Sequence, residues 1–207
     1  LTLAKGLVNL GIYVDIFTNR KSKRINKYRT IGISKANIEF FNTNILKIEK
    51  LLWQIKKIEI FSQSLGNKKI LDFDGKKDQL FSIIKNYELN KYLKSALDKN
   101  KLVKFKKYTN NPSVFSEKKY NLIINCDNKS FLTKKYFSKK ISKDYYSYAH
   151  TTLINHKNFQ KNNIATQIFT EIGPLAFLPI SNFQTSIVGS FKGSKNINLE
   201  SLIKKYN

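Results

Sequence analysis

The first residues of the chain show a helical pattern of apolar positions that changes to a strand pattern. Three leucines recur at helical spacing, namely Leu3, Leu7 and Leu10. Gly11 follows, where a glycine commonly ends a helix. Residues 13–17 are apolar apart from Asp15, which indicates a strand. A helix that ends in glycine and leads directly into a strand predicts the second half of a β-α-β unit.

The next segment predicts a loop, a helix and a β-hairpin. Residues 18–30 are polar and basic, which is typical of a loop. From Lys35 to Leu52 the apolar residues fit a helix, with Ile38, Phe41, Ile45 and Ile48 on one side. Apolar residues alternate with charged ones at 58–60, and the turn LGNKK leads to the apolar run 70–73. This arrangement predicts a hairpin with one buried face.

The middle of the chain combines a second helix with short strand candidates. We expect Asn86 to cap a helix whose inner stripe is Leu89, Leu93, Ala96 and Leu97. Residues 103–105 and 114–115 are strand candidates on either side of a loop at 110–112. The run 122–124 is apolar without alternation, as in a central parallel strand that is covered on both faces.

After Lys143 the pattern becomes that of a sheet. Alternating residues mark three strand candidates, at 146–152, 164–168 and 185–188. No helical pattern separates them, which predicts an antiparallel sheet. The chain is therefore expected to be α/β, with a nucleotide-binding part that is interrupted by pieces of a second, sheet-rich part.

Composition supports a folded domain and a reducing compartment. The 207 residues are 41% hydrophobic, which is enough to build a packed core. The one cysteine excludes an internal disulfide framework, and neither a signal peptide nor an apolar run of membrane-spanning length is visible, so we expect a cytoplasmic protein. The chain begins at Leu1 and contains no methionine, from which we expect it to be the middle of a longer protein.

The net charge of +24 suggests nucleic-acid binding, but the kinds of basic residue argue against it. Only three of the 38 basic residues are arginine, the group suited to bidentate phosphate and guanine contacts. The lysines are spread over the whole length, as the codon bias of an AT-rich genome would impose. We therefore expect no nucleic-acid partner. Attraction to an anionic membrane surface stays open, because lysine suffices there as a point charge.

Four segments in order resemble the ubiquinone-biosynthesis branch of the FAD-dependent aromatic-ring hydroxylases (2-polyprenylphenol hydroxylases). They are LTLAKGLVNLGIYVDIF (1–17), RTIGIS (29–34), LFSIIKNYELNKYLKSAL (80–97), and the pair YNLIINCD (120–127) and IGPLAFLPI (172–180) with SIVGSF beyond it. The last pair is the most specific of the four. Their shared order and spacing cover nearly the whole chain.

The resemblance implies a fold, an activity and its partners. Residues 1–50 and 76–142 would form part of an FAD-binding, Rossmann-like domain of the glutathione-reductase type. Residues 51–75 and 143–207 would supply sheet pieces of a substrate domain, as in p-hydroxybenzoate hydroxylase, with both domains incomplete. The implied activity is hydroxylation of a polyprenylated phenol with FAD, with NAD(P)H as electron donor. The greasy substrate would favour work at the inner face of the membrane or within a biosynthetic complex.

The resemblance also marks four candidate cofactor-binding residues, each with a plainer alternative. Arg29 would hydrogen-bond near the flavin, or it is one more surface cation. Asp127 ends the predicted buried strand, where ligands bind in open α/β sheets, or it is a turn residue. Gly173 and Pro174 would bring the backbone near the flavin ring, or they only make a tight turn before a strand. Cys126 is expected to be a small buried hydrophobe.

Two positions depart from the family pattern. The acid expected to bind the adenosine ribose falls at Thr18, and the Asp-Gly motif reads Asp127-Asn128. These departures support a second hypothesis, a non-catalytic relative that acts as an interaction subunit. A third hypothesis is a basic protein that binds polyanions. Neither a metal nor a catalytic triad is expected, because His150 and His156 have no cysteine or acidic cluster nearby in the sequence.

Overall fold

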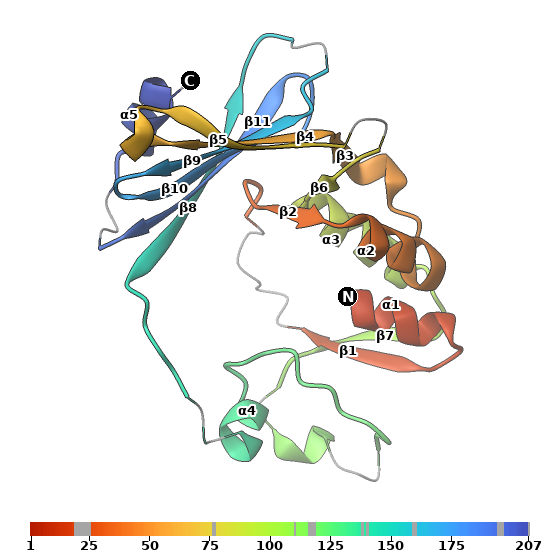
Figure 1. Cartoon of the computed structure of the whole chain (residues 1–207). Coiled ribbons are helices and arrows are strands. Elements are labelled where there is room, and N and C mark those ends of the chain that lie inside the picture. Colours follow the sequence, from red (N-terminus) through yellow and green to blue (C-terminus); the bar gives the residue numbers. More distant parts are fainter. Residues whose placement is uncertain are drawn as a thin grey trace.

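The computed structural model of the chain contains three sheets and five α-helices in its described part (Figure 1). The structure describes residues 1–18, 26–75, 78–109, 111–115, 119–137, 139, 141–158, 161–193 and 197–206. Most of the loop predicted at 18–30, and Asn110 of the loop predicted at 110–112, lie outside these residues.

The largest layer is a six-stranded sheet with the order β5-β4-β9-β10-β11-β8. Its strands are β4 (Lys57–Ser62), β5 (Lys68–Asp74), β8 (Ser147–Asn155), β9 (Ile164–Thr170), β10 (Gly173–Pro179) and β11 (Gln184–Lys192). Neighbouring strands are antiparallel except β4 and β9, which are parallel. The hairpin and the antiparallel run of strands predicted after Lys143 are both confirmed, with β10 as an additional strand.

A three-stranded antiparallel sheet with the order β2-β6-β3 lies against the large sheet (Figure 1). Its strands are β2 (Thr30–Ile33), β3 (Leu52–Ile55) and β6 (Phe81–Lys85). The helical elements beside it are α2 (Lys35–Phe40), the π-helical turn η1 (Phe41–Ile45), the short 3-10 helix η2 (Glu49–Leu51) and α3 (Asn86–Asp98). Sequence patterning did not predict this sheet.

The predicted β-α-β half is present as a small separate layer. β1 (Val14–Thr18) follows α1 (Thr2–Asn9) and pairs in parallel with β7 (Val103–Lys107). Gly11 takes a left-handed φ of 78° just after α1, as predicted. Beyond β7 lie the 3-10 helix η4 (Pro112–Phe115) and α4 (Phe131–Tyr136), and an extended segment then returns to β8 (Figure 1).

The two faces of the six-stranded sheet are covered by different elements. On one face Ala165 and Ile180 pack with Ile55 and Ile83 of the three-stranded sheet. On the other face Leu175, Ile187 and Phe191 are covered by the apolar side of α5 (Leu199–Tyr206), which follows the last strand. The large sheet is therefore the central layer between α5 and the three-stranded sheet.

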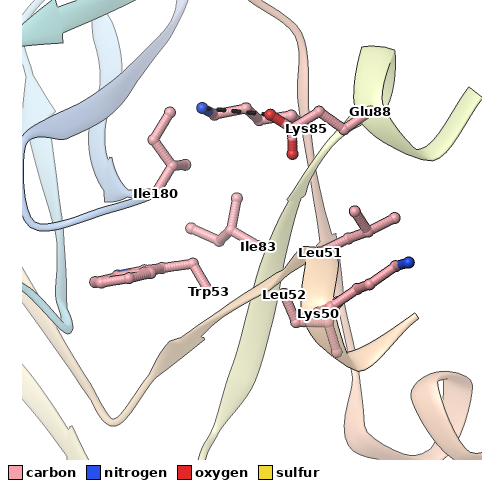
Figure 2. A pocket seen from close by; sticks show the side chains of 8 residues that line it. All are labelled: Lys50, Leu51, Leu52, Trp53, Ile83, Lys85, Glu88 and Ile180. Carbon is pink, nitrogen blue, oxygen red and sulfur yellow. Dashed lines mark ion pairs between the residues drawn. The ribbon is translucent and has the colours of Figure 1, made fainter. Parts of the chain in front are cut away.

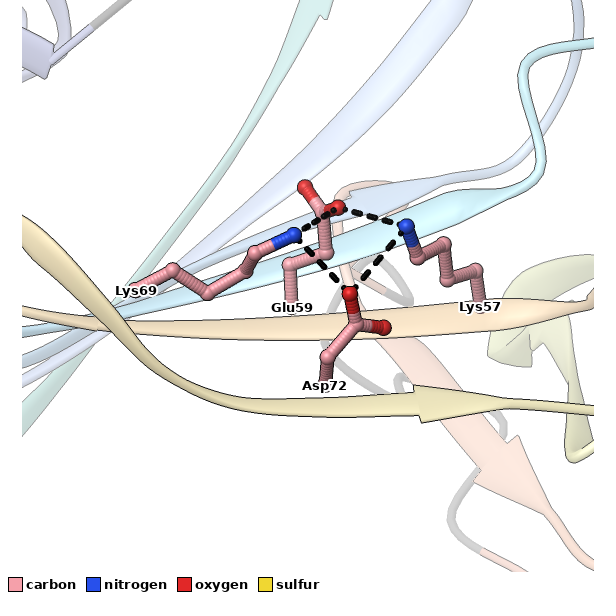
Figure 3. A network of polar contacts seen from close by, with 4 residues as sticks. All are labelled: Lys57, Glu59, Lys69 and Asp72. Atoms are coloured by element: carbon pink, nitrogen blue, oxygen red, sulfur yellow. Dashed lines mark hydrogen bonds and ion pairs between the residues drawn. The ribbon is translucent and has the colours of Figure 1, made fainter.

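A square of alternating charges joins β4 to β5 (Figure 3). Lys57 Nζ lies 2.9 Å from Glu59 Oε1 and 3.2 Å from Asp72 Oδ2. Lys69 Nζ completes the square at 3.1 Å from the same Glu59 oxygen and 2.8 Å from the Asp72 oxygen. Because these residues come from both strands, the charges fix the pairing register of the hairpin.

The helix predicted from Lys35 to Leu52 is wrong beyond Ile45. Leu46 is extended, with φ −170° and ψ 138°, and Leu52 already belongs to β3. Asparagine side chains compete for the backbone here, because Asn42 Oδ1 accepts from the Ile48 amide at 3.0 Å and Asn44 Nδ2 donates to the Phe40 carbonyl at 3.1 Å. The apolar spacing alone could not reveal this competition.

Two predicted strands are also wrong. Val114 and Phe115 lie in η4, where the Phe115 ring packs on Phe17 with 4.9 Å between the ring centroids. The run 122–124 is irregular and exposed, with no strand of the described chain beside it. An apolar run becomes a strand only where a neighbour takes up its backbone hydrogen bonds.

Three predictions of burial and one of capping need correction. In α1 the buried residue is Val8, while Leu3 and Leu10 of the predicted stripe are exposed. β5 is exposed along its whole length, so the hairpin has no fully buried face. Cys126 is exposed because the segment around it lacks a covering layer. The N-cap of α3 is Lys85, since the chain enters the helix directly from β6, and Asn86 donates its amide to the Arg29 carbonyl.

Candidate functional site

The candidate site is the seam where the three-stranded sheet meets the start of β11. Thr30 at the start of β2 and Ser186 on β11 share a hydrogen bond between their hydroxyls at 3.0 Å. Beside it Lys85, the last residue of β6, donates from Nζ to Gln184 Oε1 at 3.0 Å. These polar contacts join strands that are far apart in the sequence. Ser186 is fully buried, so its hydrogen bond to Thr30 belongs to the interior of the protein.

A small cavity opens along the same seam (Figure 2). Its volume is about 130 Å³. The lining is mixed. Trp53, Ile83 and Ile180 are apolar, and Lys85 and Glu88 are charged and form an ion pair at 3.6 Å. Sites for small organic ligands usually measure about 300–1,000 Å³. The seam cavity is therefore large enough for one small group and too small to enclose a whole flavin or substrate.

The indole of Trp53 fixes the outer side of the cavity. Trp53 Nε1 donates to the carbonyl of Asn162 at 2.6 Å, and Asn162 Nδ2 donates to the carbonyl of Ser181 at 2.8 Å. His156 lies in the same cluster, with Nε2 3.0 Å from Thr185 Oγ1. The loop that follows β8 is thereby tied to both sheets. As the single tryptophan of the chain, Trp53 is also a specific fluorescence reporter of the seam.

Of the residues predicted from the sequence, Arg29 is placed beside the seam. It directly precedes Thr30, and its carbonyl accepts from the Asn86 amide at 3.0 Å. Its side chain is exposed, and within the described residues its guanidinium forms no hydrogen bond or ion pair. Arg29 therefore has a free cationic group at the edge of the candidate site.

Asp127 lies in a different part of the molecule. Its Oδ1 accepts from the Lys129 amide at 2.9 Å, and its carbonyl accepts from Thr133 Oγ1 at 2.8 Å, which leads the chain into α4. Its side chain is exposed in a turn. No described contact joins Asp127 to Arg29.

Gly173 and Pro174 begin β10, at the end of the strand remote from the seam. Gly173 has φ +136°, and a Cβ atom there would lie 2.2 Å from the carbonyl oxygen of Ser190 on β11. The glycine is thus needed for the close approach of two strands. The structure brings neither residue into contact with Arg29 or Asp127.

The described residues fit an FAD cofactor only in part. No described residues form a glycine-rich turn before a helix. The end of β1 offers the Thr18 hydroxyl where the family has an acid, and the Thr18 carbonyl already accepts from the Tyr108 amide. Arg29 and Asp127 remain as exposed polar groups that could contact such a cofactor. The fit of these residues to the cofactor is therefore incomplete.

The one acid of β1 is occupied by a cluster of its own. Asp15 Oδ2 accepts from Tyr120 OH at 2.6 Å and from Lys106 Nζ on β7. Burial raises the pKa of Asp15, but the hydrogen bonds from Lys106 and Tyr120 outweigh it and hold the pKa below its ordinary value of 3.8. Asp15 therefore serves the packing of the small layer and is not available as a second ribose-binding acid.

The described residues offer neither a metal-binding cluster nor a membrane-spanning helix. They hold no group of three or more histidine, cysteine or acidic side chains that could bind a metal ion. No helix among them is long and apolar enough to span a bilayer.

Sequence patterning missed the residues that form the seam. Two of these residues stand out in the sequence and could have been chosen as site candidates. Trp53 is the single tryptophan, and Lys85 is a charged residue at the end of an apolar run. Thr30, Gln184 and Ser186 carried none, because the contacts of a small polar side chain depend on a partner about 100 or more residues away.

Comparison with known proteins gives no match by sequence and clear matches by fold. No protein-family model matches the chain, and neither does any curated protein. PqsL of Pseudomonas aeruginosa in complex with 2-aminobenzoylacetate is 13% identical with a TM-score of 0.71, over 98% of this chain and 59% of its own. HpxO of Klebsiella pneumoniae, complexed with FAD and uric acid, is 10% identical with a TM-score of 0.68, over 99% and 58%.

A third similar structure is p-nitrophenol 4-monooxygenase PnpA of Pseudomonas putida. It is 8% identical with a TM-score of 0.61, over 98% of this chain and 57% of its own. The chain thus spans less than three fifths of the length of these proteins. Nearly all of its residues nevertheless follow their path, and the chain has the α/β fold of FAD-dependent monooxygenases.

Proposed function

We propose that the chain forms part of an FAD-dependent monooxygenase that hydroxylates an aromatic ring. The observation that carries this proposal is the agreement in fold with PqsL over 98% of the chain at a TM-score of 0.71. A fold can host several activities, so the proposal also rests on the sequence segments that resemble this class of hydroxylase.

For the substrate we propose a polyprenylated phenol of ubiquinone biosynthesis, with NAD(P)H as electron donor. Support comes from the resemblance alone, above all from GPLAFLP, which forms the whole of β10. The names of the similar structures point to other ring compounds, namely 2-aminobenzoylacetate, uric acid and p-nitrophenol. These three names support a ring as the reacting group of the substrate. They do not indicate which substituents the ring carries.

The residues of this chain would have a supporting part in the reaction. When bound, FAD supplies the oxidation chemistry. Arg29 would place a positive charge at the edge of the seam, and Asp127 would accept hydrogen bonds from the cofactor's polar groups. The buried Thr30–Ser186 contact would hold the two sheets together around the ring.

A second candidate function is that of a non-catalytic relative within a larger assembly. Thr18 favours it, because one hydroxyl cannot replace the paired acceptor oxygens of a carboxylate at the end of β1. The Asp15 cluster strengthens this point, since the neighbouring acid is already bound by Lys106 and Tyr120.

The test is made on the natural protein, purified together with whatever its reading frame adds to this chain. We expect bound FAD and an oxidation of NAD(P)H that a prenylated phenol accelerates. Arg29→Ala should weaken FAD binding by roughly tenfold, as expected for the loss of one charge-assisted hydrogen bond. Lys27→Ala, a change of charge two residues away, is the matched control. A folded protein that takes up no FAD would favour the non-catalytic relative.

A further inference from the structure

At one end of the six-stranded sheet, two turns lie beside the end of β11 and the chain entering β8. The turn between β4 and β5 meets the turn between β9 and β10, because the Glu171 amide donates to Gln63 Oε1 at 3.3 Å. The second turn meets the end of β11 through a hydrogen bond from the Lys192 amide to the Ile172 carbonyl at 3.3 Å. Gly193 then donates to the Tyr146 carbonyl at 2.8 Å. These contacts make the end of the sheet one continuous edge.

This edge, which we call the rim, exposes large apolar and aromatic side chains. Leu65 on the first turn is 56% exposed, Ile172 on the second is 43% exposed, and Tyr145 before β8 is 72% exposed. Phe169 and Tyr146 are exposed beside them. Single exposed apolar residues are common, but a group drawn from three separate segments onto one edge marks an interaction surface.

Lysines surround the rim. Lys68 follows the first turn, and Lys192 ends β11 opposite Ser147 of β8. Lys143 Nζ lies 5.5 Å from the centre of the Tyr145 ring. The acids of this edge are Glu171 and Asp144, and the Asp144 carboxylate is occupied by the Tyr146 amide. The balance of charge is positive, in keeping with the +24 of the whole chain.

We propose that the rim docks this protein onto an anionic lipid surface. Apolar side chains on protruding turns can enter the boundary between headgroups and acyl chains, and tyrosine suits this boundary because one end of it is apolar and the other polar. Lysine near an anionic leaflet adds attraction as a point charge. A protein partner would favour a broad flat patch, whereas Leu65 and Ile172 sit on two separate turns.

The docking leaves the candidate site free. The rim lies where β10 begins and the seam where β10 ends, and seven residues of strand place them roughly 20 Å apart. The inference does not depend on flavin chemistry, so its test and the test of the proposed function can fail separately.

The test is sedimentation of the protein with vesicles of phosphatidylcholine alone or mixed with phosphatidylserine. We expect binding to the mixed vesicles only. The double variant Leu65→Ser, Ile172→Ser should weaken this binding by roughly tenfold or more, through lost apolar burial. Leu71→Ser, Phe73→Ser is the matched control, because these β5 residues are about as exposed and lie outside the rim. Circular dichroism checks that each variant is folded.

Lysine variants test the electrostatic part of the proposed lipid binding. The double variant Lys68→Gln, Lys192→Gln should weaken binding to mixed vesicles roughly tenfold. The control variant Lys91→Gln, Lys99→Gln, on α3 and at its C-cap, should change binding much less. The proposal is overturned if the protein binds neither vesicle, or if rim and control variants lose binding equally. It is also overturned if light scattering shows a dimer that only the rim variants break, since the occupant would then be a second copy.

Discussion

The hydroxyls of Thr30 and Ser186 lie 3.0 Å apart, although 156 residues separate them in the chain. This contact joins the first strand of the three-stranded sheet to the interior of the six-stranded sheet. It marks the seam on which the candidate site is built. Neither residue is charged and the Ser186 side chain is fully buried, so removing one hydroxyl changes the free energy of unfolding mainly through this hydrogen bond.

Ser186→Ala should lower the free energy of unfolding by about 1–3 kcal/mol, because the Thr30 hydroxyl loses its partner in a partly buried place. Thr30→Val should have a similar effect. The double variant should cost less than the sum of the two, since both partners are then absent. Urea unfolding followed by Trp53 fluorescence gives these values. Additive effects would show that the hydroxyls do not interact.

Gly173→Ala should destabilise the protein by about 3 kcal/mol or more, because its Cβ would meet the Ser190 carbonyl and its φ would be strained. Gly66→Ala is the matched control. Gly66 also has a left-handed φ of +67°, but no atom lies within 4 Å of the added Cβ, so we expect a cost of about 1 kcal/mol. Thermal unfolding of the two variants compares them. Equal costs would contradict a requirement for close strand approach.

The charge square on the hairpin predicts a loss of stability in acid. Hydrogen bonds from Lys57 and Lys69 hold the pKa of Glu59 below its ordinary value of 4.5. A depressed pKa in the folded state stabilises the protein above pH 4.5, and this contribution is lost as the pH falls further. Glu59→Gln should remove it at a cost of less than about 1 kcal/mol at pH 7, because the square is partly exposed.

Unfolding measured from pH 7 down to pH 3 tests this prediction. The difference between the protein and the Glu59→Gln variant should shrink as the pH falls. Asp98→Asn, which breaks an exposed pair with Lys94, serves as the control and should show a smaller difference. A constant difference would mean that Glu59 contributes through packing alone.

Asp15→Asn should cost about 2 kcal/mol, because it leaves Lys106 without a counter-charge in a half-buried place. Tyr120→Phe removes one hydrogen bond from the same oxygen and should cost about 1 kcal/mol. Hydrogen exchange of the β1 and β7 amides should report both losses locally. No change in those amides would show that the cluster does not hold the small layer together.

Local periodicity was sufficient for elements that are long or strongly patterned. α1, β1, α3 and the strands after Lys143 are all present at the predicted places. The helix predicted from Lys35 ends at Ile45 and does not reach Leu52. The spacing of Ile48 and Leu52 also fits a helix, while asparagine side chains compete for the backbone before them. The strand predicted at 122–124 failed for the opposite reason, since its pattern is right and its partner is missing among the described strands.

The candidate site was harder to predict than the fold. Arg29 was proposed through a resemblance; it lies beside the seam, and its expected hydrogen bond near the flavin stays a prediction. The seam itself depends on pairs such as Lys85 with Gln184, which only the folded chain brings together. The flavin-contacting role expected of Gly173 stays a prediction, and the close approach of its backbone to Ser190 could not be inferred from one sequence.

The absorbance spectrum of the purified natural protein tests the central claim most directly. A flavin spectrum that persists through gel filtration, and that releases FAD on denaturation, is the result the proposed function predicts. A folded protein that stays colourless after incubation with excess FAD would contradict it, and the chain would then be a non-catalytic relative with the same fold.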